Sequence, residues 1–394
     1  MDHPEKPQTS GRSGVLVIDG PSERPFMRGI LVHSLMAREL PFDDALRVAG
    51  LVGEALQGRL QIERADLAEI VQQIVGREYP EISLLPAAEL SAIDVRGRSG
   101  AGPFSEGRLS QSLLASAVDP SDAFDVAREI EVELHRRGIA EIGRADLRRM
   151  AFKALDERFG SRTAERYLTW RHYQEPERPV VILIGGTTGA GKTSVALEVA
   201  LRLGISRVLS TDSIRQIMRM LIPRELVPAL HVSSFDAHRE LPTAREGGNP
   251  VVDGFINHAS AVAIGVRAMI ERSIEENASL ILDGVPLAPG TIDLEDYADG
   301  ADVIQVILAR LDETAFRSHF VTRAERERHR DSQRYLENLD AILGVQEHLL
   351  GLAEDNDVPI IDNVAVDQSV RRVIEVVVDT LRKKKEVDLS SLLL

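Results

Sequence analysis

The sequence predicts an α/β protein: a parallel sheet flanked by helices, preceded by a mainly helical N-terminal region. Two observations predict this class. From residue 180 onward, strand-like and helix-like segments alternate, which is typical of a parallel sheet covered on both faces. Before residue 172, two blocks of similar sequence follow one another, with apolar residues at helical spacing. At 394 residues, the chain is long enough for two or three domains.

The C-terminal half divides into apolar runs and amphipathic segments. Strands are expected at 180–184, 207–211, 279–283, 302–308 and 358–361. Helices are expected at 192–203, 213–221, 251–276, 312–328, 333–355 and 367–383. Segment 222–250 contains four prolines and is expected to be an irregular substrate-binding or lid insertion. In such a sheet, ligands bind at the carboxyl ends of the strands.

The N-terminal half is duplicated. Residues 25–37 align with 103–115 at an offset of 78, and seven of the thirteen positions are identical. Further on, 62–67 align with 142–147 at an offset of 80. We expect each copy to hold a short strand or hairpin followed by about three amphipathic helices. The first strands are expected at 15–19 and 93–96.

The repeats share features with a known module: Asp19-Gly20 after the first strand, Pro-Phe before the first helix, and Ala164, Tyr167 and Trp170-Arg171 in the second copy. In these features they resemble ATP-cone modules, small regulatory nucleotide-binding domains that precede several enzymes. This resemblance implies an effector nucleotide at the N-terminal repeats. The alternative is a helical packing or dimerisation module without a ligand, and duplicated modules favour a homodimer.

Composition excludes several classes of protein. The chain has 47 lysines and arginines against 62 aspartates and glutamates, a formal net charge of −15, so neither nucleic acid nor a membrane is expected as a partner. It has no cysteine, which excludes disulfides and thiolate sites. Residues 1–14 are polar, and no apolar run reaches membrane-spanning length. We therefore expect a cytoplasmic protein.

Residues 186–193 form a complete phosphate-binding loop, Gly-Thr-Thr-Gly-Ala-Gly-Lys-Thr, directly after an apolar run. A strand, a glycine-rich turn and a helix in this order place backbone N–H groups around a polyphosphate. We expect Lys192 to reach the β- and γ-phosphates and Thr193 to bind Mg²⁺, so ATP and Mg²⁺ are the expected cofactors. The expected nucleotide-binding residues are Gly186, Thr187, Thr188, Gly189, Ala190, Gly191, Lys192, Thr193 and Ser194.

Two aspartates end expected strands. Asp212 follows the strand at 207–211, and Asp283 closes the strand at 279–283. Because these strand ends face the nucleotide site, each aspartate is expected to hold Mg²⁺ or to accept the proton of an attacking hydroxyl. The residues leave open which aspartate does which. For Asp212 and Ser213, the alternative role is to cap the helix that begins there.

Arginines are concentrated in two places. Arg215 and Arg219 share one helix face, a spacing that suits a bound phosphate or carboxylate. Five arginines lie within residues 323–334 and suggest a lid over the transferred phosphoryl group, with Arg323 and Arg330 as its candidates. The alternative for both groups is a solvated helix face.

Besides the phosphate-binding loop, residues 181–384 contain the strings Leu-Gly-Ile-Ser-Arg-Val-Leu-Ser-Thr-Asp-Ser-Ile-Arg (203–215), His-Val-Ser-Ser-Phe-Asp-Ala (231–237), Val-Asp-Gly-Phe (252–255), His-Phe-Val-Thr-Arg-Ala (319–324), Arg-Tyr-Leu-Glu-Asn (334–338) and Val-Pro-Ile-Ile-Asp-Asn (358–363). In these strings the segment resembles the 2-phosphoglycerate kinase family. The resemblance implies a P-loop kinase-type parallel sheet and transfer of the γ-phosphate of ATP to the 3-hydroxyl of 2-phosphoglycerate, giving 2,3-bisphosphoglycerate and ADP.

The resemblance also implies roles for individual residues. The catalytic residues would be Lys192, Asp212, Asp283 and Arg323, and the metal ligands Thr193, Asp212 and Asp283. A small phosphorylated acid would be bound by Arg215, Arg219, His231, Ser233, Ser234 and Arg330. The family usually has Glu-Gly-Val-His where this chain has Asp-Gly-Val-Pro at 283–286. The alternatives are therefore a kinase for another small hydroxy acid or polyol, and a non-catalytic regulatory ATP-binding switch.

The predicted organisation has five parts. They are a disordered tail at 1–14, ATP-cone-like repeats at 15–88 and 89–172, a linker at 173–179 and a P-loop kinase domain at 180–386.

Overall fold

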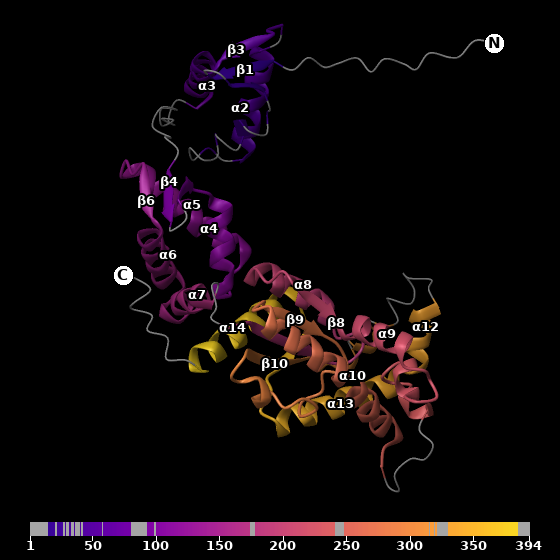
Figure 1. Cartoon of the computed structure of the whole chain (residues 1–394). Helices are drawn as coiled ribbons and strands as arrows, with labels where there is room; N and C mark the ends of the chain where they lie inside the picture. Colours follow the sequence, from indigo (N-terminus) through magenta and orange to yellow (C-terminus); the bar gives the residue numbers. More distant parts are fainter. Residues whose placement is uncertain are drawn as a thin grey trace, which may run out of the picture. The chain divides into compact units, whose positions relative to one another are not determined.

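The structure is a computed structural model of the chain (Figure 1). It describes residues 15–19, 22–26, 28, 31–32, 35, 40, 42–56, 58–79, 93–97, 100–173, 178–240, 248–314, 316–318, 320 and 330–384. The chain forms two compact units, one of residues 1–94 with 131–141 and the other of residues 95–130 with 142–394. Within the described part of the chain, no helix is both long enough and apolar enough to cross a membrane.

The first N-terminal module holds a three-stranded sheet. β1 (Leu16–Asp19) lies between β2 (Ser22–Pro25) and β3 (Gln61–Glu63), antiparallel to β2 and parallel to β3. Helices α2 (Phe42–Ala55) and α3 (Arg64–Glu78) supply much of its core, which includes the fully buried Val48, Val52 and Val75.

The second N-terminal module repeats this sheet. β4 (Asp94–Gly97) lies between β5 (Gly100–Pro103) and β6 (Glu141–Gly143), the same order as in the first module. Its helices are α4 (Glu106–Leu113), the short η2 (Leu114–Ser116), α5 (Pro120–Arg136), α6 (Arg144–Phe159) and α7 (Ser161–Tyr173). The repeated string at 62–67 and 142–147 spans the third strand of each sheet and the start of the next helix, and the sequence did not predict that strand.

The C-terminal half contains a five-stranded parallel sheet, as the sequence predicts. Its strands are β7 (Val180–Gly185), β8 (Val208–Ser210), β9 (Leu280–Asp283), β10 (Asp302–Ala309) and β11 (Ile360–Asp362), in the order β11-β10-β7-β9-β8. Asp283 is level with Ile184 on one side and with Ser210 on the other. The phosphate-binding loop, Asp283 and the start of the segment after β8 therefore meet at one edge of the sheet.

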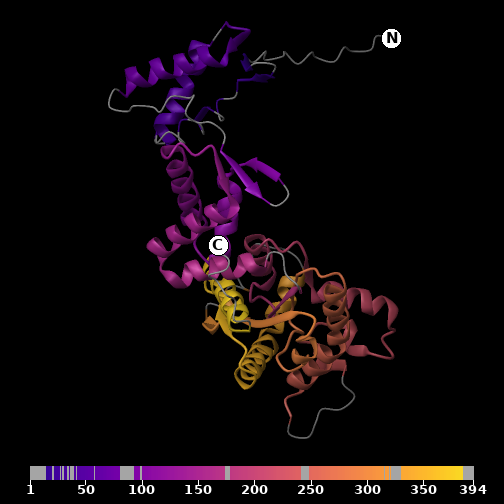
Figure 2. The same cartoon turned by 60° about the vertical axis from the view of Figure 1, so that its left-hand side comes forward.

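Helices cover both faces of this sheet (Figures 1 and 2). On one face, Ile182 and Ile184 pack with α8 (Lys192–Leu203) and α14 (Val366–Lys384). On the other, Val181 and Leu183 pack with α9 (Thr211–Leu221) and α10 (Pro250–Glu275). The alternation follows from the period of two along a strand, and it explains why β7 is apolar at successive positions.

Two predicted helices differ from the structure. The expected helix at 333–355 is two helices, α12 (Arg330–Glu337) and α13 (Leu339–Asp355). They are separated at Asn338, whose side chain donates to the carbonyl of Arg334. Of the expected helix at 312–328, only 313–314, 316–318 and 320 are described as helical. Segment 222–250 holds two short helices, η3 (Pro228–His231) and η4 (Ala237–Glu240), and its residues 241–247 lie outside the described part.

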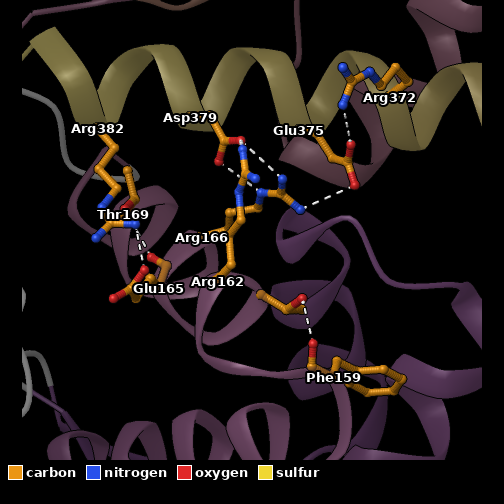
Figure 3. A network of polar contacts seen from close by, with 10 residues as sticks. Phe159, Arg162, Glu165, Arg166, Thr169, Arg372, Glu375, Asp379 and Arg382 are labelled. Carbon is orange, nitrogen blue, oxygen red and sulfur yellow. Dashed lines mark hydrogen bonds and ion pairs between the residues drawn. The ribbon is translucent and has the colours of Figure 1, made fainter.

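Most of the second module shares one compact unit with the five-stranded sheet, and α7 and α14 join them (Figure 3). The Arg166 side chain, only 8% exposed, donates two hydrogen bonds to Asp379, at 2.8 and 3.0 Å, and one to Glu375 at 3.2 Å. Arg162 adds a bond to Asp379 at 2.6 Å. Trp170 and Tyr173 of α7 also enter the apolar core beneath α8 and α14. The expected linker at 173–179 therefore joins two parts of the same unit.

Replacing Asp379 by alanine is expected to lower the free energy of unfolding of this unit by about 3 kcal/mol, because the buried Arg166 charge loses its bidentate partner. Burial raises the pKa of Asp379, but hydrogen bonds from Arg166 and Arg162 outweigh it, so the net shift is downward. A carboxyl with a lowered folded-state pKa stabilises the fold above its unfolded pKa, about 3.9, and loses that contribution as the pH falls further.

Urea unfolding followed by circular dichroism, at neutral pH and below the pKa of a free carboxyl, measures both effects. The difference between parent and Asp379→Ala should be large at neutral pH and should shrink in acid. The control Arg372→Ala removes an exposed partner of Glu375 and should cost less than about 0.5 kcal/mol. Equal losses in the two variants at neutral pH would contradict this account of the α7–α14 contact.

Candidate active site

The phosphate-binding loop connects β7 to α8 in a conformation that requires glycine. Gly186 and Gly191 have φ values of 136° and 84°. A Cβ atom on Gly186 would lie 2.1 Å from the Leu308 carbonyl oxygen, and one on Gly191 would lie 2.3 Å from Nδ2 of Asn363. Neither position tolerates a side chain, because both the backbone angles and the neighbouring atoms exclude it. The loop therefore keeps the close backbone approach that phosphate binding needs.

Hydrogen bonds from distant elements anchor the loop. Asn363, just after β11, donates through Nδ2 to the carbonyl of Ala190 at 2.7 Å, and its own Oδ1 accepts from Ser369 at 2.7 Å. Thr187 donates to the carbonyl of Ile342 at 3.2 Å. Sequence reasoning gave Asn363 no role. Its signal was a polar residue directly after an apolar strand, the position at which ligand sites form in parallel sheets.

Lys192 is buried at the start of α8. Its Nζ donates to the carbonyl of Thr187 at 2.8 Å, and it forms no ion pair with a carboxylate among the described residues. Burial lowers the pKa of Lys192 to about 8, while the charges of Asp283 and Asp212 oppose this shift. The ammonium group has lost much of its hydration without gaining an anion, so a bound phosphate would stabilise its charged form.

Asp283 closes β9 beside Thr193. The Thr193 hydroxyl donates to Oδ2 of Asp283 at 2.6 Å. Asp283 is only 2% exposed, and its Oδ1 accepts no hydrogen bond from the described residues. Burial raises the pKa of Asp283, although Thr193 and Lys192 favour the charged form. A buried carboxylate oxygen without a donor, next to a hydroxyl, fits Mg²⁺, which proteins commonly hold through one or two carboxylates and substrate phosphates.

Asp212 lies in the first turn of α9 and is open to solvent. Its side chain is 83% exposed and lies 3.4 Å from the guanidinium of Arg215. The helix is capped by Ser210, whose Oγ accepts from the backbone N–H of Ser213 at 3.2 Å. The alternative capping role of Asp212 and Ser213 is therefore wrong. The negative charge of Asp212 favours the protonated forms of both Lys192 and Asp283. Asp212 therefore lies near enough to these two residues to act on the same site.

Two of the expected substrate-binding residues hold backbone instead. Arg215 donates to the carbonyls of Leu230 and Val232, at 3.1 and 3.3 Å. A ring nitrogen of His231 lies 2.9 Å from the carbonyl oxygen of Ile222. Both contacts fix the segment after α9 against that helix.

The remaining residues that the sequence predicted to bind the acceptor differ in burial, and not all of them are described by the structure. Arg219 is half-buried and forms no ion pair with the described carboxylates. Ser234 is buried and Ser233 half-buried in the turn that Arg215 fixes. Arg323 lies outside the described residues, and Arg330 is described only as the first residue of α12.

Comparison with known proteins decides the family. Residues 164–223 match the family described as Zeta toxin. The 2-phosphoglycerate kinase of Pyrococcus furiosus is 36% identical over 290 residues, which cover 73% of this chain and 94% of that protein. The 2-phosphoglycerate kinase of Methanococcus vannielii is 37% identical over 293 residues, 73% and 93% of the two chains. That of Methanocaldococcus jannaschii is 34% identical over 296 residues, 75% and 94%.

The chain belongs to the 2-phosphoglycerate kinase family. The predicted resemblance is thus confirmed, and with it the class of enzyme, a phosphotransferase. Among solved structures, the chain is similar to a gluconokinase from Sinorhizobium meliloti 1021, with 16% identity and a TM-score of 0.30 over 52% of this chain and 94% of that one. It is also similar to a shikimate kinase from Bacteroides thetaiotaomicron, with 17% identity and a TM-score of 0.27 over 52% and 96%.

In this member of the 2-phosphoglycerate kinase family, sequence reasoning missed a buried histidine. His258 of α10 is 1% exposed, and neither ring nitrogen has a hydrogen-bond partner among the described residues. Burial lowers the pKa of His258 to about 4, with Arg215 adding to the shift and Asp212 opposing it. Its imidazole is therefore neutral and offers one donor and one acceptor near Asp212 and Arg215. A single histidine in a long helix gave no signal in the sequence.

A second group that sequence reasoning missed ties residues 235–239 to α12 and to Asn338 after it. Asp236 is buried and accepts from Arg334, and it forms an ion pair with Arg239 at 3.2 Å. Arg239 in turn donates to Oδ1 of Asn338 at 2.8 Å. Phe235 packs edge-on against Tyr335, with ring centroids 6.0 Å apart. The strings at 231–237 and 334–338, which carried the family resemblance, are thus in contact in the fold.

Proposed function

We propose that this chain transfers the γ-phosphate of ATP to the 3-hydroxyl of 2-phosphoglycerate, giving ADP and 2,3-bisphosphoglycerate. The observation that carries the proposal is the cluster of Lys192, Thr193 and Asp283 at the phosphate-binding loop, in a chain that aligns over nearly the whole length of kinases named for this substrate. In the reaction, the bond between the acceptor oxygen and the γ-phosphorus forms as the bond to the β,γ-bridging oxygen breaks.

On the donor side, the backbone of residues 186–194 surrounds the triphosphate, and Lys192 moves its charge from the Thr187 carbonyl to the phosphates. Thr193 and Asp283 would hold Mg²⁺, which would supply positive charge to the phosphates of the nucleotide. We assign Asp283 to the metal because it is buried and bonded to Thr193, whereas exposed Asp212 orients the hydroxyl and accepts its proton.

On the acceptor side, Arg219, Ser233 and Ser234 bind the phosphate and carboxylate of the substrate, and His258 offers a further hydrogen bond. Arg215 and His231 keep this segment in place. Arg323 and Arg330 are proposed to belong to a lid over the transferred phosphoryl group. Such a lid neutralises the charge that develops there and excludes water. The homodimer, the effector nucleotide and the cytoplasmic location stay predictions.

A second acceptor is favoured by one observation. Pro286, where the family usually has histidine, is buried and has neither an N–H nor a side-chain donor. An acceptor that does not need this donor, another small hydroxy acid or a polyol, is the alternative substrate.

An ADP-release assay separates these possibilities. Mg-ATP is supplied with 2-phosphoglycerate, 3-phosphoglycerate or glycerate, and release is compared with the rate without an acceptor. The proposal expects stimulation by 2-phosphoglycerate above the other two. Stimulation by glycerate alone would favour the alternative acceptor, and no stimulation by any of the three would remove the glycerates as substrates.

A further inference from the structure

The two halves of the candidate active site rest on different elements. The phosphate-binding loop follows β7, whereas Ser233 and Ser234 lie between η3 and η4. We call residues 232–236 the acceptor segment, because the proposed function places the acceptor there. Phosphoryl transfer needs the attacking oxygen within about 3–3.5 Å of the γ-phosphorus. The fold must therefore set the position of this segment relative to the loop.

A row of aromatic side chains connects the loop to the acceptor segment. Phe320 packs against the loop, since a Cβ atom on Gly189 would lie 2.3 Å from Cζ of its ring. The centroid of the Phe320 ring is 6.1 Å from that of Tyr335 in α12, which is 6.0 Å from that of Phe235. Phe235 and Phe320 are both buried and belong to one cluster. Because such interiors are close-packed, a shift of one ring displaces its neighbours.

A polar link joins the same elements. Asp236 ends the acceptor segment, and its side chain is only 4% exposed and accepts a hydrogen bond from Arg334 of α12. The Arg334 guanidinium also lies 5.7 Å from the centroid of the Phe235 ring. Nη1 of Arg239 lies 3.2 Å from Oδ1 of Asp236, and its Nη2 donates to Oδ1 of Asn338 at 2.8 Å. Charge and ring contacts therefore tie the acceptor segment to α12.

The hydrogen bonding of Asp236 is incomplete. Arg239 is close to its Oδ1, but this oxygen accepts no hydrogen bond from the described residues. A buried carboxylate oxygen without a donor is costly. Because the two atoms are already within hydrogen-bonding distance, a small reorientation of the segment is enough to complete the bond. The network therefore has a better-bonded arrangement available to it, which a bound ligand can stabilise.

We propose that Asp236 is a positioning residue that couples the two halves of the site. In this coupling, nucleotide at the phosphate-binding loop orders the acceptor segment through Phe320, Tyr335 and Phe235, and the bond from Arg334 to Asp236 holds the ordered segment for transfer. The inference rests on the proposed function, which gives the loop its nucleotide and the segment its acceptor. By linkage, nucleotide and acceptor should tighten each other's binding by the same factor.

Hydrogen exchange of the full chain tests the coupling without any acceptor. The backbone amides of residues 228–240 are followed with and without Mg²⁺ and a non-hydrolysable ATP analogue at saturating concentration. We expect the analogue to slow exchange in the acceptor segment about fivefold or more. Asp236→Ala should lose most of this effect, whereas Asp236→Asn, which keeps an oxygen that can accept from Arg334, should keep part of it.

Phe320→Leu tests the other end of the row and serves if Asp236→Ala does not fold. It keeps an apolar side chain in the cluster but shortens the contact with Gly189, so the analogue should slow exchange less than in the parent chain. The matched control is Asp340→Ala, which removes an exposed partner of Arg317 and should respond like the parent. No slowing in the parent, or equal slowing in the parent, Asp236→Ala and Phe320→Leu, would overturn the proposal.

Calorimetry separates this inference from the proposed function. The affinity for the analogue is measured with and without 2-phosphoglycerate. The parent should bind the analogue about fivefold or more tightly when 2-phosphoglycerate is present, and Asp236→Ala should show no such gain. Binding of 2-phosphoglycerate that leaves the affinity for the analogue unchanged would contradict the coupling. If 2-phosphoglycerate binds neither alone nor with the analogue, the proposed acceptor is wrong, and hydrogen exchange still decides the coupling.

Discussion

Replacing Lys192 by alanine is expected to lower kcat by a factor of about 10³ or more, because the charge that faces the transferred phosphoryl group is lost. The structure gives the reason in energetic terms. Lys192 is buried and donates to the Thr187 carbonyl, and this burial lowers its pKa to about 8 although the charges of Asp283 and Asp212 oppose the shift. A bound phosphate supplies a counter-charge and so offsets the desolvation free energy of the buried ammonium group.

The lowered pKa adds a pH dependence to this prediction. In the ligand-free chain, Lys192 loses its proton as the pH rises through about 8, well below the ordinary value for lysine. Nucleotide phosphates favour the charged form, so above this pH ATP binding should take up a proton and become weaker. Calorimetry in buffers of different ionisation enthalpy measures the proton uptake directly.

Stopped-time assays of Lys192→Ala at saturating ATP and acceptor give kcat without a contribution from weaker binding. Lys153→Ala is the control, since that lysine is exposed and pairs only with Glu157 among the described residues. It should leave kcat unchanged. Near-parental turnover of Lys192→Ala would exclude the loop as the catalytic phosphate site.

Replacing Asp283 by asparagine should lower kcat by about 10² to 10³ and raise the Mg²⁺ concentration needed for half-maximal activity. Asparagine keeps the shape and the bond from Thr193 but removes the charge at the buried oxygen that lacks a donor. Because burial raises the folded-state pKa of Asp283, its charged form destabilises the fold above that pKa. The variant should therefore be at least as stable as the parent at neutral pH.

A Mg²⁺ titration of activity, with thermal unfolding beside it, measures both outcomes. Asp212→Asn serves as the comparison within the site and should lower kcat without moving the Mg²⁺ midpoint. Asp293→Asn, at an exposed aspartate whose Oδ1 accepts from the backbone N–H of Glu295, should change neither. If Asp212→Asn moved the midpoint and Asp283→Asn did not, the roles of the two aspartates would be exchanged.

The fold and the donor half of the site could be predicted from the sequence because both depend on local patterns. An apolar run followed by a glycine-rich loop predicts β7, the loop and α8 to within a residue, and Asp283 follows from the end of β9. The strand register then puts Ile184, Asp283 and Ser210 at one edge, which is what parallel pairing of those strands requires.

What the sequence could not predict depends on contacts between distant residues. Arg215 looked like a substrate ligand, but it holds carbonyls fifteen and seventeen positions away. The break at Asn338 follows from a side-chain bond to the preceding turn and from its contact with Arg239. The cavity that Arg108, Arg144 and Trp170 line needs helices of the second module together with the segments that precede β8 and β9. Contacts of this kind between distant segments leave no periodic pattern in the sequence.

Phosphorus NMR of the full chain with Mg-ATP and 2-phosphoglycerate tests the central claim most directly. We expect the resonance of 2-phosphoglycerate to be replaced by the two monoester resonances of 2,3-bisphosphoglycerate, with one ADP formed per molecule of product. Release of inorganic phosphate and ADP while 2-phosphoglycerate stays unchanged would contradict it.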